Sequence, residues 1–221
     1  MAAQLNRDDV TEMDLNTKHV GVQSTHLLYR KFGKRLCDVV FSMCGLIICA
    51  IPMFLIAIVV RLTSPGPAIF CQLRAGRKGK LFVLYKFRSM YTSAPEKSNA
   101  DFSTNERKHY VTKFGRFMRK TSIDELPQLF NVLKGEMSFI GPRPLAKTDE
   151  YVLSLRSESG ADRVLPGISG LAQVNGQNTI TDVTKAAWDS EYAKNCSFIT
   201  DFGIVVKSLW VVTLHRNIDH D

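Results

Sequence analysis

The sequence predicts an α+β fold, in which a mainly helical domain with a small β element is anchored by one N-terminal apolar helix. Residues 39–60 form an uninterrupted run without a single charge. Residues 68–73 and 81–88 have the composition of strands and flank a basic, Gly-containing turn. Most other segments place apolar residues at helical spacing. A chain of 221 residues accommodates one domain of ordinary size beside the apolar helix.

The composition is basic, with 29 Lys and Arg against 21 Asp and Glu. This excess suits anionic partners, among them lipid headgroups, nucleotide diphosphates and nucleic acid. The 5 cysteines form no Cys-x-x-Cys pair, and the 5 histidines are scattered. We therefore expect free thiols in a reducing compartment and no zinc site.

Residues 1–28 are polar and carry both signs of charge, which predicts a loose N-terminal extension. A secretory signal places its apolar region close behind a short basic start. Here a long polar segment precedes the apolar run. We expect the apolar segment to be kept in the mature protein.

Residues 29–62 are predicted to form a re-entrant membrane helix. Its uncharged run is about 33 Å long as a straight helix, enough to cross a hydrocarbon core. Pro52 removes a backbone donor, so the helix should bend or break at Ile51-Pro52. Basic residues flank both ends, and the positive-inside rule puts both on the cytoplasmic side. A proline-kinked full span and a buried core helix are the alternatives.

Residues 63–214 are predicted to form the catalytic body, followed by a tail at 215–221. Alternation along residues 81–88 points Lys86 and Arg88 to one face, either toward an anion or simply into solvent. Residues 91–105 are expected to form a surface loop. Residues 106–120 have the pattern of one basic amphipathic helix, lying either on an anionic membrane or against the core.

Three further helices are expected in this body. They cover residues 147–157, 181–194 and 198–214, with a loop rich in Gly and Asn at 166–178 between the first two. The helix at 198–214 is strongly apolar and is either interfacial or part of the core.

Residues 124–144, reading DELPQLFNVLKGEMSFIGPRP, are the most informative stretch of the chain. Ser122 and Glu125 have the spacing of a helix capping box, which is a purely structural interpretation. A helix start also favours phosphate binding. Asp124 and Glu125 together would repel phosphate, and Mg²⁺ bound to both carboxylates removes that repulsion.

Arginines complete this interpretation of an anion site. Arg119 and Arg143 are candidates for phosphate binding, and prolines on both sides of Arg143 hold its backbone rigid. A carboxylate in such a place can attack phosphorus and form an acyl phosphate that a second substrate resolves.

The chain resembles the bacterial sugar transferases of the monotopic phosphoglycosyl transferase superfamily. The motifs that carry the resemblance are KRLCDVV at 34–40, LYKFRSM at 84–90, KFGRFMRKTSIDELPQLFNVLKGEMSFIGPRP at 113–144 and PGISGLAQVNG at 166–176. They occur in the family's order from about residue 34 to residue 202.

The resemblance implies transfer of a sugar 1-phosphate from a UDP-sugar to undecaprenyl phosphate, releasing UMP, with Mg²⁺ as cofactor. It implies that Asp124 is the nucleophile and that Glu125 is its partner in metal binding or proton transfer. Arg119 and Arg143 match phosphate-binding arginines, and Lys86 lies in a matching motif. It also implies a re-entrant helix broken at Pro52 and a cytoplasmic catalytic body on the bacterial inner membrane, in contact with anionic lipids.

The chain departs from the family pattern at three places. Ile51 stands where some members have serine, Leu165 where a basic residue is common and Gln177 where many have arginine. An N-acetylated amino sugar is the expected substrate, with galactose and glucose as alternatives. O-antigen, capsule and protein glycosylation are the candidate pathways.

Two other classes of protein are considered. A nonenzymatic membrane-surface protein accounts for the charge and the apolar helix but leaves the Asp-Glu and Pro-Arg-Pro placement unexplained. A nucleic-acid-binding domain is suggested by net charge alone, and the basic residues flank an apolar helix as in lipid-facing proteins, so no nucleic acid partner is expected.

Overall fold

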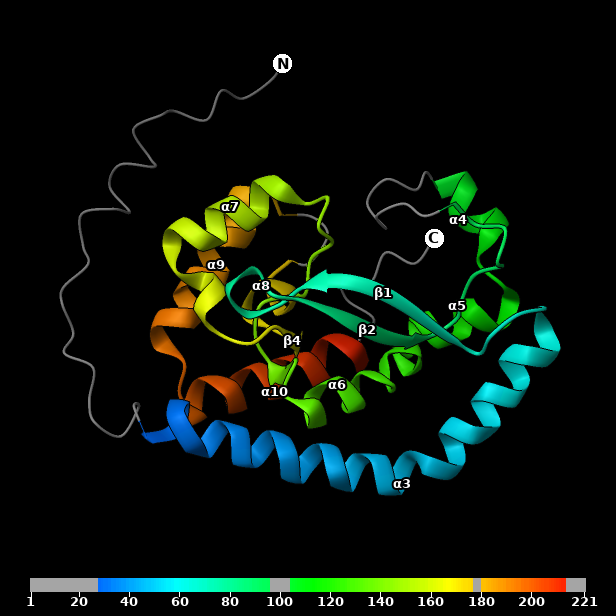
Figure 1. Ribbon diagram of the computed structural model, residues 1–221, viewed down its shortest axis with the longest axis horizontal. Helices are drawn as coiled ribbons and strands as arrows, with labels where there is room; N and C mark the ends of the chain where they lie inside the picture. Colours follow the sequence, from blue (N-terminus) through cyan, green and yellow to red (C-terminus); the bar gives the residue numbers. More distant parts are fainter. Residues whose placement is uncertain (1–27, 96–103, 177–179, 214–221) are drawn as a thin grey trace, which may run out of the picture.

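The structure is a computed structural model that describes residues 28–95, 104–176 and 180–213. Helices make up most of this part, and two two-stranded sheets supply its β element. One long helix, α3, runs along one side of a body built from the other elements (Figure 1). The α+β prediction is confirmed for these residues. Residues 1–27 and the tail at 215–221 lie outside them.

The membrane candidate is one helical stretch, formed by η1 (Tyr29–Gly33) and α3 (Lys34–Thr63). It is long and apolar enough to cross a membrane, judged by length and composition. The helix continues through Pro52 and bends in its second half (Figure 1). Proline lacks an N–H and crowds the preceding turn, which accounts for the bend. The break expected at Ile51-Pro52 is thus a bend within one helix.

Both halves of α3 rest on the same body. In the first half, Arg35 donates hydrogen bonds to the carbonyls of Val132 and Leu133, at 2.6 and 2.8 Å, near the end of α6 (Gln128–Lys134). A cation at this end of α6 also suits the helix dipole. In the second half, Val60 packs with Phe87 and Met118 in a buried cluster. The body therefore holds α3 on either side of its bend.

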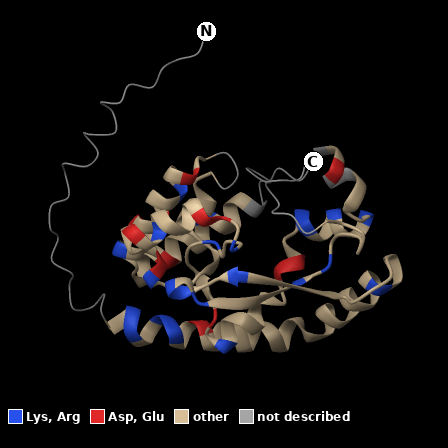
Figure 2. Ribbon diagram, turned by 45° about the horizontal axis from the view of Figure 1, so that its top comes forward, with Lys and Arg blue, Asp and Glu red and all other residues tan. Residues whose placement is uncertain are grey.

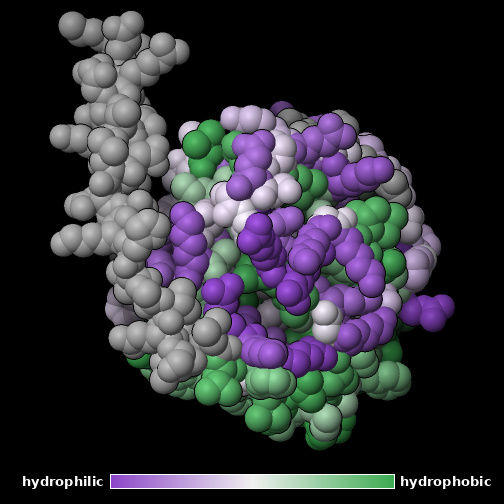
Figure 3. All heavy atoms as spheres, turned by 60° about the vertical axis from the view of Figure 1, so that its left-hand side comes forward, coloured by the Kyte–Doolittle hydropathy of each residue, from purple (hydrophilic) through white to green (hydrophobic). Residues whose placement is uncertain are grey.

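The opposite side of α3 is an exposed apolar surface, which excludes a buried core helix. Ile48 and Ile51 are 75% and 74% exposed. No charged residue lies between Asp38 and Arg61, whereas basic residues gather at the start of the helix (Figure 2). Hydrophobic residues gather along the same edge of the molecule, below a hydrophilic face (Figure 3).

Helix α10 (Phe198–Thr213) confirms the helix predicted at 198–214 and adds to this exposed apolar surface. Ile199 is 81% exposed and Leu209 is 62% exposed. Asp201 is buried and accepts hydrogen bonds from Tyr29 at 2.7 Å and from Lys34 at 2.6 Å. These contacts fasten α10 to the start of α3.

The predicted hairpin is confirmed. Strands β1 (Ile69–Ala75) and β2 (Leu81–Phe87) pair antiparallel, and the turn between them contains η2 (Arg77–Gly79). Phe82 and Leu84 are buried against Val132 and Met137, so one face of the hairpin covers α6. The side chains of that face include Lys86, because alternate residues of a strand point the same way.

A second, parallel sheet was not predicted. It joins β3 (Ser138–Ile140) to β4 (Gly167–Ser169). A Cβ at Gly167 would lie 2.1 Å from the Gly141 nitrogen, and one at Gly170 would lie 2.1 Å from the Gly141 oxygen. Only glycine permits this approach, and the Gly141 and Gly167 nitrogens donate across it to Ser169 and Pro142 at 2.8 and 2.9 Å. The loop after β3 is therefore fixed by β4.

The single helix predicted at 106–120 is wrong. The chain forms α4 (Thr104–Tyr110) and α5 (Lys113–Lys120), with an extended step between them. The nitrogen of Thr112 donates to the Ser89 carbonyl at 3.1 Å, and the Thr112 hydroxyl caps α5 by accepting from Gly115. The hydrogen bond to Ser89, in the segment after β2, therefore interrupts the predicted helix between α4 and α5. Met118 of α5 is fully buried, while Phe117 is exposed.

The remaining helices pack against one another, next to the β1–β2 turn. They are α7 (Glu150–Ser159), η5 (Ala161–Arg163), α8 (Leu171–Val174) and α9 (Asp182–Asn195). They confirm the helices predicted at 147–157 and 181–194 with shifted ends. The loop expected at 166–178 instead contains β4 and α8, and Gln177 lies outside the described residues.

Candidate active site

Asp124 and Glu125 lie in a short 3-10 turn, η4 (Ile123–Glu125), between α5 and α6. The predicted capping box is wrong. Ser122 adopts a left-handed conformation, φ 56°, and its side chain makes no capping hydrogen bond. A left-handed residue reverses the chain direction after α5 instead of starting a helix, and α6 begins only after Pro127. The turn, and not a helix start, presents the carboxylates.

Asp124 is buried, with 8% of its surface exposed. Burial raises the pKa of its carboxyl to about 6, and the adjacent charge of Glu125 adds to the shift. Three basic side chains act in the opposite direction and favour the ionised form, namely Lys86, Arg119 and Arg143. The structure thus brings these three predicted residues into the electrostatic field of Asp124. A carboxylate with this pKa is poised to work at neutral pH.

Glu125 is held by Lys86, whose Nζ lies 2.6 Å from Oε1. Burial raises the pKa of Glu125, but Lys86, Arg143 and a hydrogen bond from Gln128 outweigh burial and leave the pKa below its ordinary value. Glu125 therefore stays ionised beside Asp124. Its carboxylate is already engaged, which distinguishes it chemically from Asp124.

Arg119 is positioned by Ser89, which accepts a hydrogen bond from Nε at 2.9 Å. The contact depends on Gly115, because a Cβ there would lie 2.0 Å from the Ser89 carbonyl oxygen. Glycine lets α5 approach the chain after β2, and this approach carries Arg119 to the carboxylates. This close approach explains the glycine in the KFGRFMR motif.

Arg143 is positioned by the loop that β4 fixes. Its backbone carbonyl accepts a hydrogen bond from Nη1 of Arg156 at 2.9 Å. Arg156 is itself buried and paired with buried Asp189, whose Oδ2 lies 2.8 Å from Nε. A buried pair on α7 and α9 therefore holds the backbone of Arg143, while the Arg143 side chain acts on both carboxylates.

Arg88 does not share the predicted role. Its Nη1 and Nη2 donate to the carbonyls of Pro65 and Ser64, each at 2.6 Å, and the side chain is buried. The guanidinium thus fastens the chain after α3 to the end of β2. We assign Arg88 to the framework and not to the phosphate site, contrary to the expectation from strand alternation.

Asp124 is the residue of this site that could hold a magnesium ion together with substrate phosphates. In the part of the chain that the structure describes, no three His, Cys, Asp or Glu side chains form a cluster able to hold a metal alone. Mg²⁺ commonly binds through one or two carboxylates together with substrate phosphates. Asp124 meets that requirement, while Glu125 is engaged by Lys86.

Several contributing residues were missed from the sequence. They are Gln128, Ser89, Arg156 and Asp189, and the last three act through hydrogen bonds or ion pairs that no local spacing reveals. Gln128 alone had a detectable signal, since it stands three residues after Glu125, where short helices bring side chains together.

The site is coupled to the apolar helix. Leu126 directly follows Glu125 and packs in the cluster that contains Val60 of α3. The hairpin contributes Lys86, which pairs with Glu125. Helix α3 also packs against α6, the helix that follows the carboxylates. The carboxylate pair is thus placed beside α3, at the border between the polar site and the exposed apolar surface.

Comparisons with known proteins agree with this arrangement. The sequence profile of a family described as bacterial sugar transferase matches residues 29–215. The chain is 40% identical over 193 residues to the galactosyl transferase CpsE of Streptococcus agalactiae, covering 82% of this chain and 42% of the relative. It is 40% identical over 196 residues to an undecaprenyl-phosphate galactose phosphotransferase of Salmonella typhimurium, covering 82% of this chain and 40% of the relative.

These two relatives are longer, and the chain spans about two fifths of their length. An uncharacterized sugar transferase of Bacillus subtilis, EpsL, is closer in size. It is 42% identical over 188 residues, which are 84% of this chain and 89% of the relative. The residues that the family profile matches, 29–215, contain the carboxylate pair, the arginines and α3. The chain therefore belongs to the bacterial sugar transferase family.

Proposed function

We propose that this protein transfers a sugar 1-phosphate from a UDP-sugar to undecaprenyl phosphate, releasing UMP. The observation that carries the proposal is the position of Asp124, a buried carboxylate amid basic side chains, two residues before Leu126 in the cluster with α3. A reaction between a nucleotide sugar and a lipid phosphate needs a polar centre of this kind beside an apolar surface. The relatives named for undecaprenyl-phosphate transfer support the same reaction.

In the first step, a carboxylate oxygen of Asp124 attacks the phosphorus that carries the sugar. A bond forms between this oxygen and phosphorus, the bond to the bridging oxygen breaks, and its electron pair leaves with UMP. Arg119 and Arg143 act electrostatically on Asp124 and are placed to offset the negative charge of the phosphates. Lys86 keeps Glu125 ionised and in place.

In the second step, a phosphate oxygen of undecaprenyl phosphate attacks the same phosphorus. The bond to Asp124 breaks, the carboxylate is regenerated and the sugar diphosphate remains on the lipid. Mg²⁺, bound by Asp124 and substrate phosphates, would supply charge neutralisation in this site. Ionised Asp124 is the reactive form, and burial keeps water away from the acyl phosphate.

The proposed location is the cytoplasmic face of the bacterial inner membrane. The bend at Pro52, the basic flanks of α3 and the contacts of both its halves with one body support a monotopic, re-entrant arrangement. The exposed apolar surfaces of α3 and α10 would then lie in the bilayer, with anionic headgroups around the basic residues. Tags on both termini should be protected from reagents outside the cell, and a labelled C-terminus would favour a full span.

The sugar is a separate question. Relatives are named for the transfer of galactose and glucose, which supports a hexose, while an N-acetylated amino sugar remains a prediction from the resemblance. A panel of UDP-galactose, UDP-glucose and the N-acetylated UDP-sugars separates them.

The test is UMP release from this panel with undecaprenyl phosphate and Mg²⁺, using the detergent-solubilised full chain. Incubation with the donor alone, followed by rapid quenching and mass spectrometry, should reveal a sugar-phosphate increment on Asp124. Asp124→Asn should show neither UMP release nor the mass increment. Glu158→Gln, at an exposed position on α7, should show the two as the wild type does. Absence of turnover with every donor would favour a nonenzymatic membrane-binding protein.

A further inference from the structure

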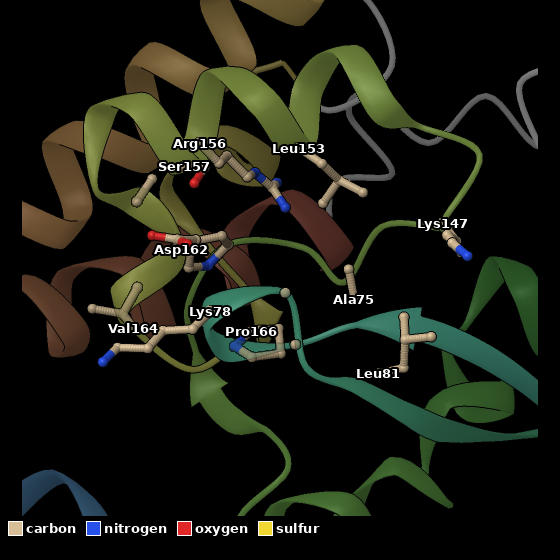
Figure 4. Close-up of a pocket in the computed structure, with 14 residues that line it drawn as sticks. Ala75, Lys78, Leu81, Lys147, Leu153, Arg156, Ser157, Asp162, Val164 and Pro166 are labelled. Carbon is tan, nitrogen blue, oxygen red and sulfur yellow. The ribbon is translucent and has the colours of Figure 1, made fainter.

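A cavity of about 300 Å³ lies between the β1–β2 turn and helix α7 (Figure 4). Its wall includes Gly76 and Lys78 of the turn, Pro142 of the loop after β3, Ser157 of α7 and Asp162 of η5. The catalytic carboxylates are not part of this wall. The cavity is therefore a second recess, next to the site described above.

Two arginines, Arg74 and Arg143, connect the wall of this cavity with the surroundings of the carboxylates. Arg143 acts electrostatically on Asp124 and Glu125, and it also acts on Arg74. Ala75, which follows Arg74, lines the cavity. Pro142, which precedes Arg143, lines it as well. A hydrogen bond from Ala75 nitrogen to the Leu145 carbonyl, 2.9 Å, joins the two segments.

Arg74 has the features of an anion ligand. It pairs across the hairpin with Phe82 and so lies on the face that also carries Lys86. Its Nη2 donates to Gln72 at 2.5 Å, while its Nε is buried and makes no hydrogen bond with the residues that the structure describes. Burial and the charge of Arg143 lower its pKa, against the effect of Asp149. Two neighbouring guanidinium groups of this kind are stabilised by an anion that both can contact.

The cavity wall has the character of a small-molecule site, mostly apolar with few polar groups. Leu81, Leu153 and Val164 supply apolar surface. The carboxylate of Asp162 and the hydroxyl of Ser157 supply hydrogen-bonding groups, and a carboxylate can accept hydrogen bonds from the hydroxyls of a ribose, as it does in dinucleotide-binding folds. Lys78 adopts a left-handed backbone conformation, φ 55°, of the sort that concentrates at binding loops.

We propose that this cavity receives the nucleoside of the donor, with Asp162 accepting hydrogen bonds from its ribose and Arg74 sharing the adjacent phosphate with Arg143. The inference rests on the proposed function, in which attack at the sugar-bearing phosphorus releases a nucleoside monophosphate. The leaving group then extends from Asp124 past Arg143 and Arg74 into the cavity. Arg74 would stabilise the negative charge that develops on this leaving group.

The experiment compares two inhibitors of the full-length enzyme, UMP and inorganic pyrophosphate. Asp162→Asn should raise the KM for the UDP-sugar and the inhibition constant of UMP about tenfold, as for loss of one hydrogen bond to a charged group. Inhibition by pyrophosphate should not change, since it lacks a nucleoside. Arg74→Gln should weaken both inhibitors and lower kcat, and Arg74→Lys should restore part of the loss.

Controls separate this inference from a folding defect and from the proposed function. The KM for undecaprenyl phosphate and the melting temperature should be unchanged in Asp162→Asn, and Glu158→Gln should resemble the wild type throughout. If the wild type releases UMP but Asp162→Asn and Arg74→Gln bind donor and UMP normally, the cavity assignment is wrong and the transferase activity stands. If the wild type turns over no UDP-sugar, calorimetry still tests the cavity assignment by comparing the affinity of UMP for the wild type and for Asp162→Asn. Weaker binding to the variant would support the assignment, and equal binding would refute it.

Discussion

The Nζ atom of Lys86 lies 2.6 Å from Oε1 of Glu125, so the end of strand β2 is joined to the carboxylate next to Asp124. Both side chains are 19% exposed, which keeps their attraction stronger than that of a surface pair. Because the pKa of Glu125 is lowered in the folded state, this pair contributes stability at neutral pH and loses it as the pH falls through that pKa.

The rate of adduct formation should depend on pH through Asp124. The pKa of its carboxyl is raised to about 6, and only the ionised form attacks phosphorus. The single-turnover rate with a UDP-sugar should therefore fall about tenfold per pH unit below 6 and level off above 7. Lys86→Met should move this fall in rate to higher pH, because Lys86 lowers the pKa of Asp124. A fall in rate near pH 4 would contradict the assignment.

Asp124→Asn should abolish transfer and also raise the melting temperature. A carboxyl whose pKa is raised by burial destabilises the folded state at every pH above its ordinary pKa of 3.8, with the full effect above about pH 6, and the amide removes that charge. Differential scanning fluorimetry at pH 7.5 should show an increase of a few degrees. The increase should shrink as the pH falls below about 6 and should disappear only below about 3.8, where the carboxyl is protonated in the unfolded chain as well. A lower melting temperature throughout this pH range would indicate a structural role.

Gly115→Ala should impair both folding and catalysis. The added Cβ would lie 2.0 Å from the Ser89 carbonyl oxygen, so α5 must move and take Arg119 with it. A destabilisation of about 1–3 kcal/mol is expected, as for overpacking in general, with at least a tenfold loss in kcat/KM. Gly203→Ala on α10 is the matched control, because its Cβ would meet no atom within 4 Å. Equal behaviour of the two variants would refute the argument.

Arg156→Met should destabilise the protein by about 3–5 kcal/mol, because it leaves the buried carboxylate of Asp189 without its cation. The double variant Arg156→Met with Asp189→Leu should regain most of that stability. It should still show reduced kcat, since the hydrogen bond to the Arg143 carbonyl is lost in both variants. Denaturant unfolding and UMP release measured on the same samples test this. Full recovery of kcat would assign Arg156 to stability alone.

The elements with strong local signals were predictable. The uncharged run of α3, the β1–β2 hairpin and the apolar helix α10 follow from composition and periodicity. Asp124 and Glu125 were singled out as neighbouring carboxylates near arginines, and the family resemblance supplied the roles predicted for them. Lys86 was found from strand alternation, which also placed Arg88 on the same side. The backbone carbonyls that occupy Arg88 come from the segment after α3 and leave no local trace.

The parts that depend on contacts distant in sequence could not be predicted. The parallel pairing of β3 and β4 joins segments of three residues each, too short for a periodic pattern. The division of residues 106–120 into two helices depends on Ser89, which precedes them by many residues. The Ser122 and Glu125 spacing matched a capping box, but the left-handed backbone at Ser122 overrode it. Tertiary geometry decided each of these cases.

Under the proposed function, the attachment of α3 to the body on both sides of its bend would affect how the lipid substrate arrives. Arg35 and Val60 fasten the helix at two separated points, so in the proposed membrane arrangement the fold itself would set the height of the Asp124 carboxylate above the acyl chains. A phosphate on a long isoprenoid tail diffuses only within the plane of the bilayer. Its search for the carboxylate then takes place in two dimensions, at a depth that the protein has already matched.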